Sequence, residues 1–248
     1  MTFRYLEDSL GDSEIGSYLD FQATMQEPTK TVLSYTLDLA GYLNTHGLST
    51  NYGVFGGYAV LSHLMDSFGE PIAQVWRGSS DIDMGGDIKV LSSIRAGYHV
   101  TNDNSSPNIP DKRTLKLDTN GEGECKIDFY LGDVHRKYGP KQINKHFGIP
   151  LRVVKPEYII KGKLMTPLEE HQHCGDILGM LAVLERQGCS LDYLPGILSH
   201  EEADALRTRI VIGEREFSRD RLGFFPSEGF STELKKKLRH MRTVKRLI

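Results

Sequence analysis

Three aspartates have the residue type and the spacing that suit divalent cations. Asp81 and Asp83 are separated by one residue in Asp81-Ile-Asp-Met84, and Asp128 lies in a second alternating stretch, Lys126-Ile-Asp-Phe-Tyr-Leu131. Residues two positions apart in a strand lie on one face, so the first two carboxylates point the same way. Magnesium prefers a few carboxylates together with phosphate oxygens and water. A third carboxylate on a neighbouring strand would complete the donor set for two-metal phosphoryl transfer.

A glycine pair precedes these aspartates. Gly56-Gly57 follows the short apolar run Tyr52-Gly-Val-Phe55 and opens a stretch with helical spacing that ends at Phe68. Glycines at the start of a helix let a phosphate approach the backbone amides, and the helix dipole favours an anion there. A glycine pair or an Asp-x-Asp pair has little specificity alone. The combination is more informative, because clustered acids in apolar strands are costly unless cations neutralise them.

The patterns around these residues predict an α+β fold, with strands mainly before residue 155 and a helical part after it. Thr114 to Leu131 has two alternating stretches around Asn120-Gly121, which is typical of a β-hairpin. Residues 101–112 are expected to form a polar loop. Helical spacing, a capping box at Ser199 and the last stretch of the chain predict helices over the following ranges: 29–44, 58–68, 156–165, 173–187, from 199 onward, and from about 232 to the end.

Composition and length limit the class of protein. With 248 residues, 39% of them hydrophobic and 25% charged, the chain is typical of a globular protein, and we expect a core over 1–155 and a helical domain over 156–248. No apolar run approaches the roughly 20 residues of a membrane span, and the first thirty residues lack the apolar core of a signal peptide. A cytoplasmic location without a membrane partner is therefore expected. The three cysteines have no Cys-x-x-Cys spacing, which favours reduced thiols.

The net charge of −3 is unevenly distributed along the chain. Residues 205–248 contain 12 Lys and Arg against 5 Asp and Glu, and residues 235–246 contain no acid at all. A basic end on an acidic body favours contact with an anionic partner such as RNA. A solvated helix face is the alternative interpretation of this segment.

Together these motifs resemble the polymerase-β-type nucleotidyltransferase superfamily, in particular its branch of minimal nucleotidyltransferases and type IV abortive-infection toxins. That branch has Gly-Gly-x-Ala and then Arg-x-Thr/Ser-x-Asp-hydrophobic-Asp, which Gly56-Gly-Tyr-Ala59 and Arg77-Gly-Ser-Ser-Asp-Ile-Asp83 match. Lys163 matches a later lysine at a helix start, and Asp176 matches the second acid of a helical motif. The first acid of that motif is absent, because His173 stands in its place.

The resemblance implies a mixed β-sheet flanked by helices, with a C-terminal helical part. It also implies Mg²⁺-dependent transfer of a nucleoside monophosphate from a nucleoside triphosphate, such as ATP, to an acceptor hydroxyl. Asp81 and Asp83 would bind two Mg²⁺ ions, or Mn²⁺, while Asp128 would bind the catalytic ion and help to deprotonate the acceptor. Lys163 would neutralise phosphate charge. Nucleotide-binding roles are implied for Gly56, Gly57, Arg77, Ser79, Ser80 and Asp176. The acceptor would be an RNA or tRNA end, a protein or a small molecule, and a toxin-type enzyme would have an antitoxin partner.

Other interpretations stay open. A non-catalytic nucleotide- or RNA-binding module would keep this fold without turnover, and a metal-dependent phosphohydrolase would use the same carboxylates. Solvent exposure or a plain ion pair is the alternative role for several single residues: Arg77, Lys126, Tyr130, Lys163 and Asp176. Zinc binding is a weaker alternative, because matched spacing is missing around the candidate ligands His171, His173 and Cys174.

Overall fold

The structure is a computed structural model. It describes residues 10–23, 25, 29–69, 72, 79–118, 124–133, 139–168, 172–189, 194 and 196–217. Several predictions fall outside these residues: those for Arg77, the Asn120-Gly121 turn, His171, the basic stretch 235–246 and the helix expected from 232. The chain divides into two compact units. The first comprises Met1–Ser62 and Gly78–Lys155, and the second comprises His63–Arg77 and Pro156–Ile248.

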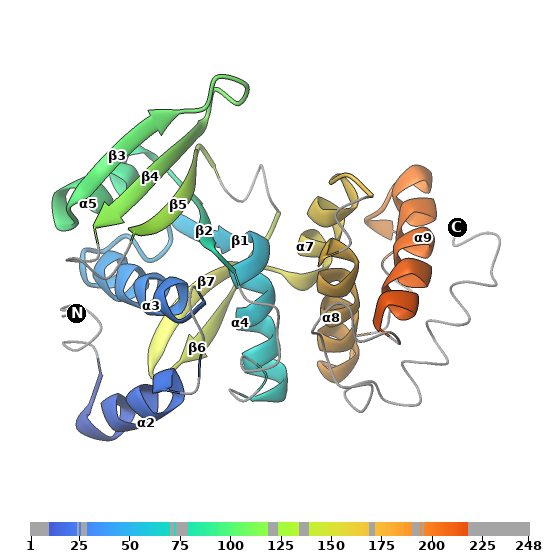
Figure 1. Ribbon diagram of the computed structural model, residues 1–248, viewed down its shortest axis with the longest axis horizontal. Coiled ribbons are helices and arrows are strands. Elements are labelled where there is room, and N and C mark those ends of the chain that lie inside the picture. Colours follow the sequence, from blue (N-terminus) through green and yellow to red (C-terminus); the bar gives the residue numbers. More distant parts are fainter. Residues whose placement is uncertain are drawn as a thin grey trace. The chain divides into compact units, whose positions relative to one another are not determined.

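The first unit is built on a seven-stranded mixed sheet with the strand order β3-β4-β5-β2-β1-β7-β6 (Figure 1). Its strands are β1 (Tyr52–Phe55), β2 (Asp81–Gly86), β3 (Val100–Ser105), β4 (Lys112–Asp118), β5 (Glu124–Leu131), β6 (Lys141–His146) and β7 (Ile149–Val154). Strand β2 runs parallel to β5, and β1 runs parallel to β7, whereas the other neighbouring pairs are antiparallel. The predicted mixed sheet flanked by helices is confirmed.

Helices cover the apolar face of this sheet. Helices α3 (Thr29–Thr45) and α5 (Ile88–Gly97) contact both β2 and β5. Helix α5 begins after Asp87, whose carboxylate accepts hydrogen bonds from the Lys89 and Val90 amides at 2.9 and 3.0 Å and so caps the helix. The residues of β2 and β5 on this face are fully buried: Ile82, Met84, Ile127 and Phe129. Alternation therefore places their polar neighbours on the opposite face.

Two further helices complete the first unit. Helix α2 (Asp12–Ala23) packs Tyr18 and Phe21 against Phe147 in the turn between β6 and β7, with ring centroids 5.3 Å apart in both pairs. Helix α4 (Gly56–Phe68) begins directly at the end of β1, as the glycine pair predicts. Its first seven residues belong to the first unit and the rest to the second.

The second unit contains the predicted C-terminal helices. Helices α7 (Pro156–Leu164), α8 (Gln172–Arg186) and α9 (His200–Phe217) contact one another (Figure 1). The predicted capping box opens α9: the Ser199 amide donates to Glu202 Oε2 at 2.7 Å, and the Glu202 amide donates to Ser199 Oγ at 3.2 Å. None of the helices in the described part of the chain combines the length and apolarity needed to cross a membrane.

The prediction of a polar loop over 101–112 is wrong for half of its length. Residues 101–105 belong to β3, which pairs antiparallel with β4 at the edge of the sheet, and β4 itself begins at Lys112. Strand β3 has the sequence Val-Thr-Asn-Asp-Asn-Ser and lacks apolar alternation. Pairing with β4 holds it in place, together with Asp103, which accepts hydrogen bonds from Arg95 and Arg113. Backbone pairing and ion pairs can thus form a strand that the hydrophobic pattern does not indicate.

Candidate active site on the polar face of the sheet

Adjacent parallel strands bring the three aspartates to one face. Strands β2 and β5 pair so that Asp83 lies opposite Asp128, and Asp81 lies opposite Lys126. Side chains alternate along both strands, so the three acids share the face opposite the buried core. Acids that are distant in the sequence therefore become neighbours through strand pairing.

The glycine turn lies against the same acids. Strand β1 pairs with β2 so that Phe55 is opposite Asp83, and the chain turns into α4 at Gly56 with φ of 66°. A Cβ atom on Gly56 would lie 1.9 Å from Asp83 Oδ2 and 2.6 Å from Asp83 Cγ. Only glycine leaves room for the carboxylate here and also adopts this φ without strain. The first turn of α4, with the buried Gly57, is thereby placed beside Asp83.

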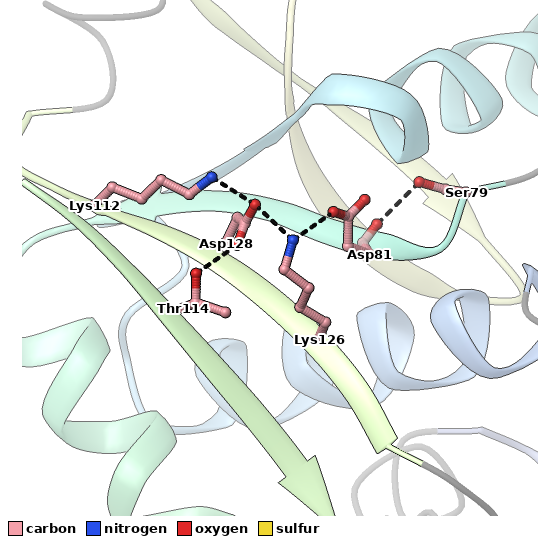
Figure 2. Close-up of polar contacts among 6 residues, drawn as sticks. All are labelled: Ser79, Asp81, Lys112, Thr114, Lys126 and Asp128. Atoms are coloured by element: carbon pink, nitrogen blue, oxygen red, sulfur yellow. Dashed lines mark hydrogen bonds and ion pairs between the residues drawn. The ribbon is translucent and has the colours of Figure 1, made fainter. Parts of the chain in front are cut away.

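Asp128 is enclosed by three hydrogen-bond donors (Figure 2). Its Oδ2 accepts from Lys112 Nζ at 2.7 Å and Lys126 Nζ at 3.0 Å, and its Oδ1 accepts from Thr114 Oγ1 at 2.9 Å. Burial works to raise the pKa of Asp128, but the hydrogen bonds from these three groups outweigh burial and hold the pKa below its ordinary value. Asp128 is therefore a carboxylate at neutral pH.

Lys126 joins Asp128 to Asp81 (Figure 2). Its Nζ lies 3.0 Å from Asp128 Oδ2 and 3.1 Å from Asp81 Oδ2, while its side chain stays 42% exposed. Burial lowers the pKa of Lys126, yet the hydrogen bonds to the two carboxylates raise it above the ordinary lysine value. Lys126 is thus partly exposed to solvent, and it is also paired with two carboxylates.

The two serines before β2 differ in exposure. Ser79 is buried, and its Oγ donates a hydrogen bond to the Asp81 carbonyl oxygen at 3.0 Å, which shapes the start of the strand (Figure 2). Ser80 is exposed. Their role in holding phosphates stays a prediction.

The second unit holds the other two predicted residues, and they bind each other. Lys163 Nζ lies 2.6 Å from Asp176 Oδ2, and the two side chains are only 9% and 0% exposed. Lys163 lies in the last turn of α7, whereas the family pattern places its lysine at a helix start. The interpretation of Lys163 as a solvated lysine is wrong, and the ion pair considered for Asp176 is present. His173 Nδ1 contacts Thr166 Oγ1 at 2.7 Å.

Lys112 and Thr114 are also parts of this face, although the sequence patterns had not assigned them to the site. Strand β4 pairs with β5 so that Thr114 lies opposite Asp128 and Lys112 lies opposite Tyr130. The polar alternation of Lys112, Thr114 and Lys116 could have indicated it. Tyr130 borders the acids too: Lys112 Nζ is 5.4 Å from its ring centroid, and the Phe55 ring meets it edge-on with centroids 5.3 Å apart.

The donor set fits a divalent ion in residue type and in strand register, because three carboxylates on one sheet face are the hard ligands that Mg²⁺ prefers. As the side chains lie, however, no group of three or more His, Cys, Asp or Glu within the described ranges is arranged to hold a metal ion. The lysine contacts account for this, since Asp81 and Asp128 are both directed onto ammonium groups. Metal binding at this face would require the carboxylates to exchange a lysine for the ion.

Comparisons with known proteins support the fold. No protein-family model matches the chain, and no curated protein matches it. Among solved structures, the chain is similar to an antigenic nucleotidyltransferase-like protein from Paracoccidioides brasiliensis. The two are 15% identical, the match covers 83% of this chain and 98% of that chain, and the TM-score is 0.50. The chain therefore has a nucleotidyltransferase-like fold.

Proposed function

We propose that this chain is a metal-dependent nucleotidyltransferase that moves a nucleoside monophosphate from a nucleoside triphosphate to an acceptor hydroxyl. One observation carries the proposal: Asp81, Asp83 and Asp128 share one face of two adjacent parallel strands, beside the Gly56 turn. Two-metal phosphoryl transfer needs such a set of clustered carboxylates. The nucleotidyltransferase-like fold supports this assignment.

The residues of the polar face would divide the reaction as follows. Asp81 and Asp83 would hold Mg²⁺ or Mn²⁺, and Asp128 would share the catalytic ion. The bound ions would neutralise phosphate charge and make the acceptor hydroxyl more acidic. The acceptor oxygen bonds to the α-phosphorus, pyrophosphate leaves with the bridging oxygen, and the hydroxyl proton passes to Asp128. The backbone amides at the start of α4, at Gly56-Gly57, would donate hydrogen bonds to phosphate oxygens.

The acceptor and partners are further proposals. The basic composition of residues 205–248 favours an RNA acceptor, such as a tRNA end, over a protein or a small molecule. ATP is proposed among the donors. A toxin role with an antitoxin partner follows from the resemblance to the abortive-infection branch, and it rests on that resemblance alone. Roles toward phosphate also stay proposals for Arg77, Ser79, Ser80, Lys163 and Asp176.

Label transfer tests the proposal. The purified chain is incubated with each α-³²P-labelled nucleoside triphosphate, with Mg²⁺ or Mn²⁺, and with tRNA, total RNA or lysate. We expect label on an acceptor, release of pyrophosphate, and loss of both in Asp81→Asn and Asp83→Asn at an unchanged Tm. Asp118→Asn is the matched control, because it lies on the same face at the far end of β4. Activity that survives in Asp81→Asn, or no label with any nucleotide, would refute the proposal.

The lysine contacts favour a second candidate, a non-catalytic nucleotide- or RNA-binding module. In this reading Lys112 and Lys126 permanently replace metal ions at the carboxylates. Such a module would bind nucleotide equally well with and without a divalent ion and would transfer no label. Release of free phosphate without labelling of an acceptor would instead indicate a phosphohydrolase.

A further inference from the structure

The polar face carries two lysines, Lys112 and Lys126, that have no role in the proposed reaction. Lys126 Nζ bridges Asp81 and Asp128, and Lys112 Nζ contacts the same Oδ2 of Asp128. The two ammonium groups thus lie against two of the three carboxylates of this face. The acids are already neutralised to a large extent before any divalent ion binds.

We propose that Lys126 is an exchangeable counter-cation: it neutralises Asp81 and Asp128 in the metal-free protein, yields both carboxylates to divalent ions, and then binds the triphosphate. The proposal rests on the proposed nucleotidyltransferase function. It makes Lys126 a substrate-binding residue and makes binding of the metal and of the nucleotide mutually dependent.

The geometry indicates that Lys126 is the lysine that moves. Its ammonium contacts one oxygen of each of two acids, Asp81 Oδ2 and Asp128 Oδ2. Its side chain is 42% exposed, against 20% for Lys112, which also lies beside the Tyr130 ring. Thr114 holds the other oxygen of Asp128, so that carboxylate keeps an anchor when Lys126 departs.

We expect the ammonium group of Lys126, once released, to bind the triphosphate. A divalent ion on Asp81 and Asp128 would repel an ammonium about 3 Å from the same oxygens, since like charges disfavour each other at this range. Lysine is a compact charge on a flexible stem and is well suited to phosphate. Strand β2 alone lies between β5, which carries Lys126, and β1, which leads into the Gly56 turn. That turn is where the triphosphate is proposed to lie.

A matched pair of variants tests this inference. Lys116 lies opposite Lys126 in the β4–β5 pair, on the same face, with a similar exposure of 40%. Its Nζ pairs with Glu124 at 2.6 Å. Lys126→Met and Lys116→Met therefore remove the same charge from the same face. Mn²⁺ affinity without nucleotide is measured by electron paramagnetic resonance, and affinity for a non-hydrolysable triphosphate is measured at saturating Mn²⁺.

Lys126→Met should change the affinity for Mn²⁺ and the affinity for the triphosphate in opposite directions. Without nucleotide, Lys126→Met should bind Mn²⁺ about tenfold more tightly than Lys116→Met, equivalent to about 1.4 kcal/mol. With Mn²⁺ present, it should bind the triphosphate about tenfold more weakly. Lys126→Arg should keep wild-type behaviour in both measurements, because it keeps the charge.

Other outcomes overturn the inference. Loss of both affinities in Lys126→Met would assign Lys126 a structural role, and affinities equal to those of Lys116→Met would make it a spectator. If the wild-type protein still transfers label, either result refutes the role inferred for Lys126 without contradicting the proposed function. A wild-type protein that binds no Mn²⁺ even with nucleotide overturns both.

Discussion

Replacing Gly56 by alanine adds a single carbon atom, Cβ, to the candidate site. Gly56 has φ of 66°, and an added Cβ would lie 1.9, 2.6 and 2.8 Å from Oδ2, Cγ and Cβ of Asp83. Contacts this short cannot persist, so the Asp83 carboxylate has to rotate away. The backbone also has to shift slightly, because rotation of the side chain leaves the Asp83 Cβ in place. We therefore expect Gly56→Ala to displace a carboxylate of the site without changing any charge.

The magnitude has two parts. A left-handed backbone costs an alanine about 1–2 kcal/mol, and forcing Asp83 off its rotamer costs about 0.5–1.5 kcal/mol more. The free energy of unfolding should fall by about 1.5–3.5 kcal/mol, which for a chain of this size lowers Tm by roughly 3–14 °C. A reacting group displaced by about 1 Å can reduce the rate about 100-fold, and we expect a loss of that order in label transfer.

Gly47→Ala is the matched control for this change. Gly47 has φ of 72° and nothing within 4 Å of an added Cβ, so its replacement has the same backbone cost without the contact. Thermal unfolding, Mn²⁺ binding and label transfer are compared between the two variants. In an Asp83→Ala background, the extra instability of Gly56→Ala over Gly47→Ala should largely disappear, because two of the three contacting atoms are gone.

One result would refute this reasoning. If Gly56→Ala matches Gly47→Ala in Tm, in Mn²⁺ affinity and in label transfer, then Asp83 does not lie against the turn. The proposed arrangement of the β1–α4 turn and the acids would then be wrong.

Three further changes test the electrostatics and the helix ends. Burial alone would raise the pKa of Asp128, but its hydrogen bonds lower the pKa below the ordinary value. This carboxylate therefore stabilises the fold above its unfolded pKa of about 3.9, and the stabilisation is lost as the pH falls through the lower folded pKa. Lys112→Met removes one of these hydrogen bonds and should move acid unfolding, followed by circular dichroism, to higher pH. Asp176→Ala leaves the buried Lys163 ammonium without its partner and should cost about 3–5 kcal/mol in urea unfolding. Ser199→Ala removes the α9 cap and should cost about 1 kcal/mol, measured by calorimetry.

Local patterns predicted a large part of the fold. Apolar spacing indicated α3, α4, α7 and α8 to within a few residues, because one buried stripe repeats with the helical period. The capping box at Ser199 marked the start of α9 for a similarly local reason. Strand β3 escaped prediction because its polar sequence takes its structure from pairing with β4.

The register of the β4–β5 pair could not be predicted from the sequence. A two-residue turn on Asn120-Gly121 would place Thr114 opposite Ile127, yet Thr114 lies opposite Asp128. A shift of one residue moves every side chain to the other face, so this difference decides whether Thr114 and Lys112 reach the acids. The outcome depends on packing of β5 between β4 and β2, which no local pattern contains.

The sequence by itself determined that Asp81 and Asp83 point the same way and that glycines open the helix after β1, because strand alternation and glycine conformation are local properties. Only the tertiary structure decided that Asp128 joins them, that Lys126 bridges two of the three carboxylates, and that Lys163 is paired with Asp176 instead of lying in solvent. These contacts join residues far apart in the chain. Their formation depends on strand order and on the burial of charge, which are properties of the folded chain as a whole.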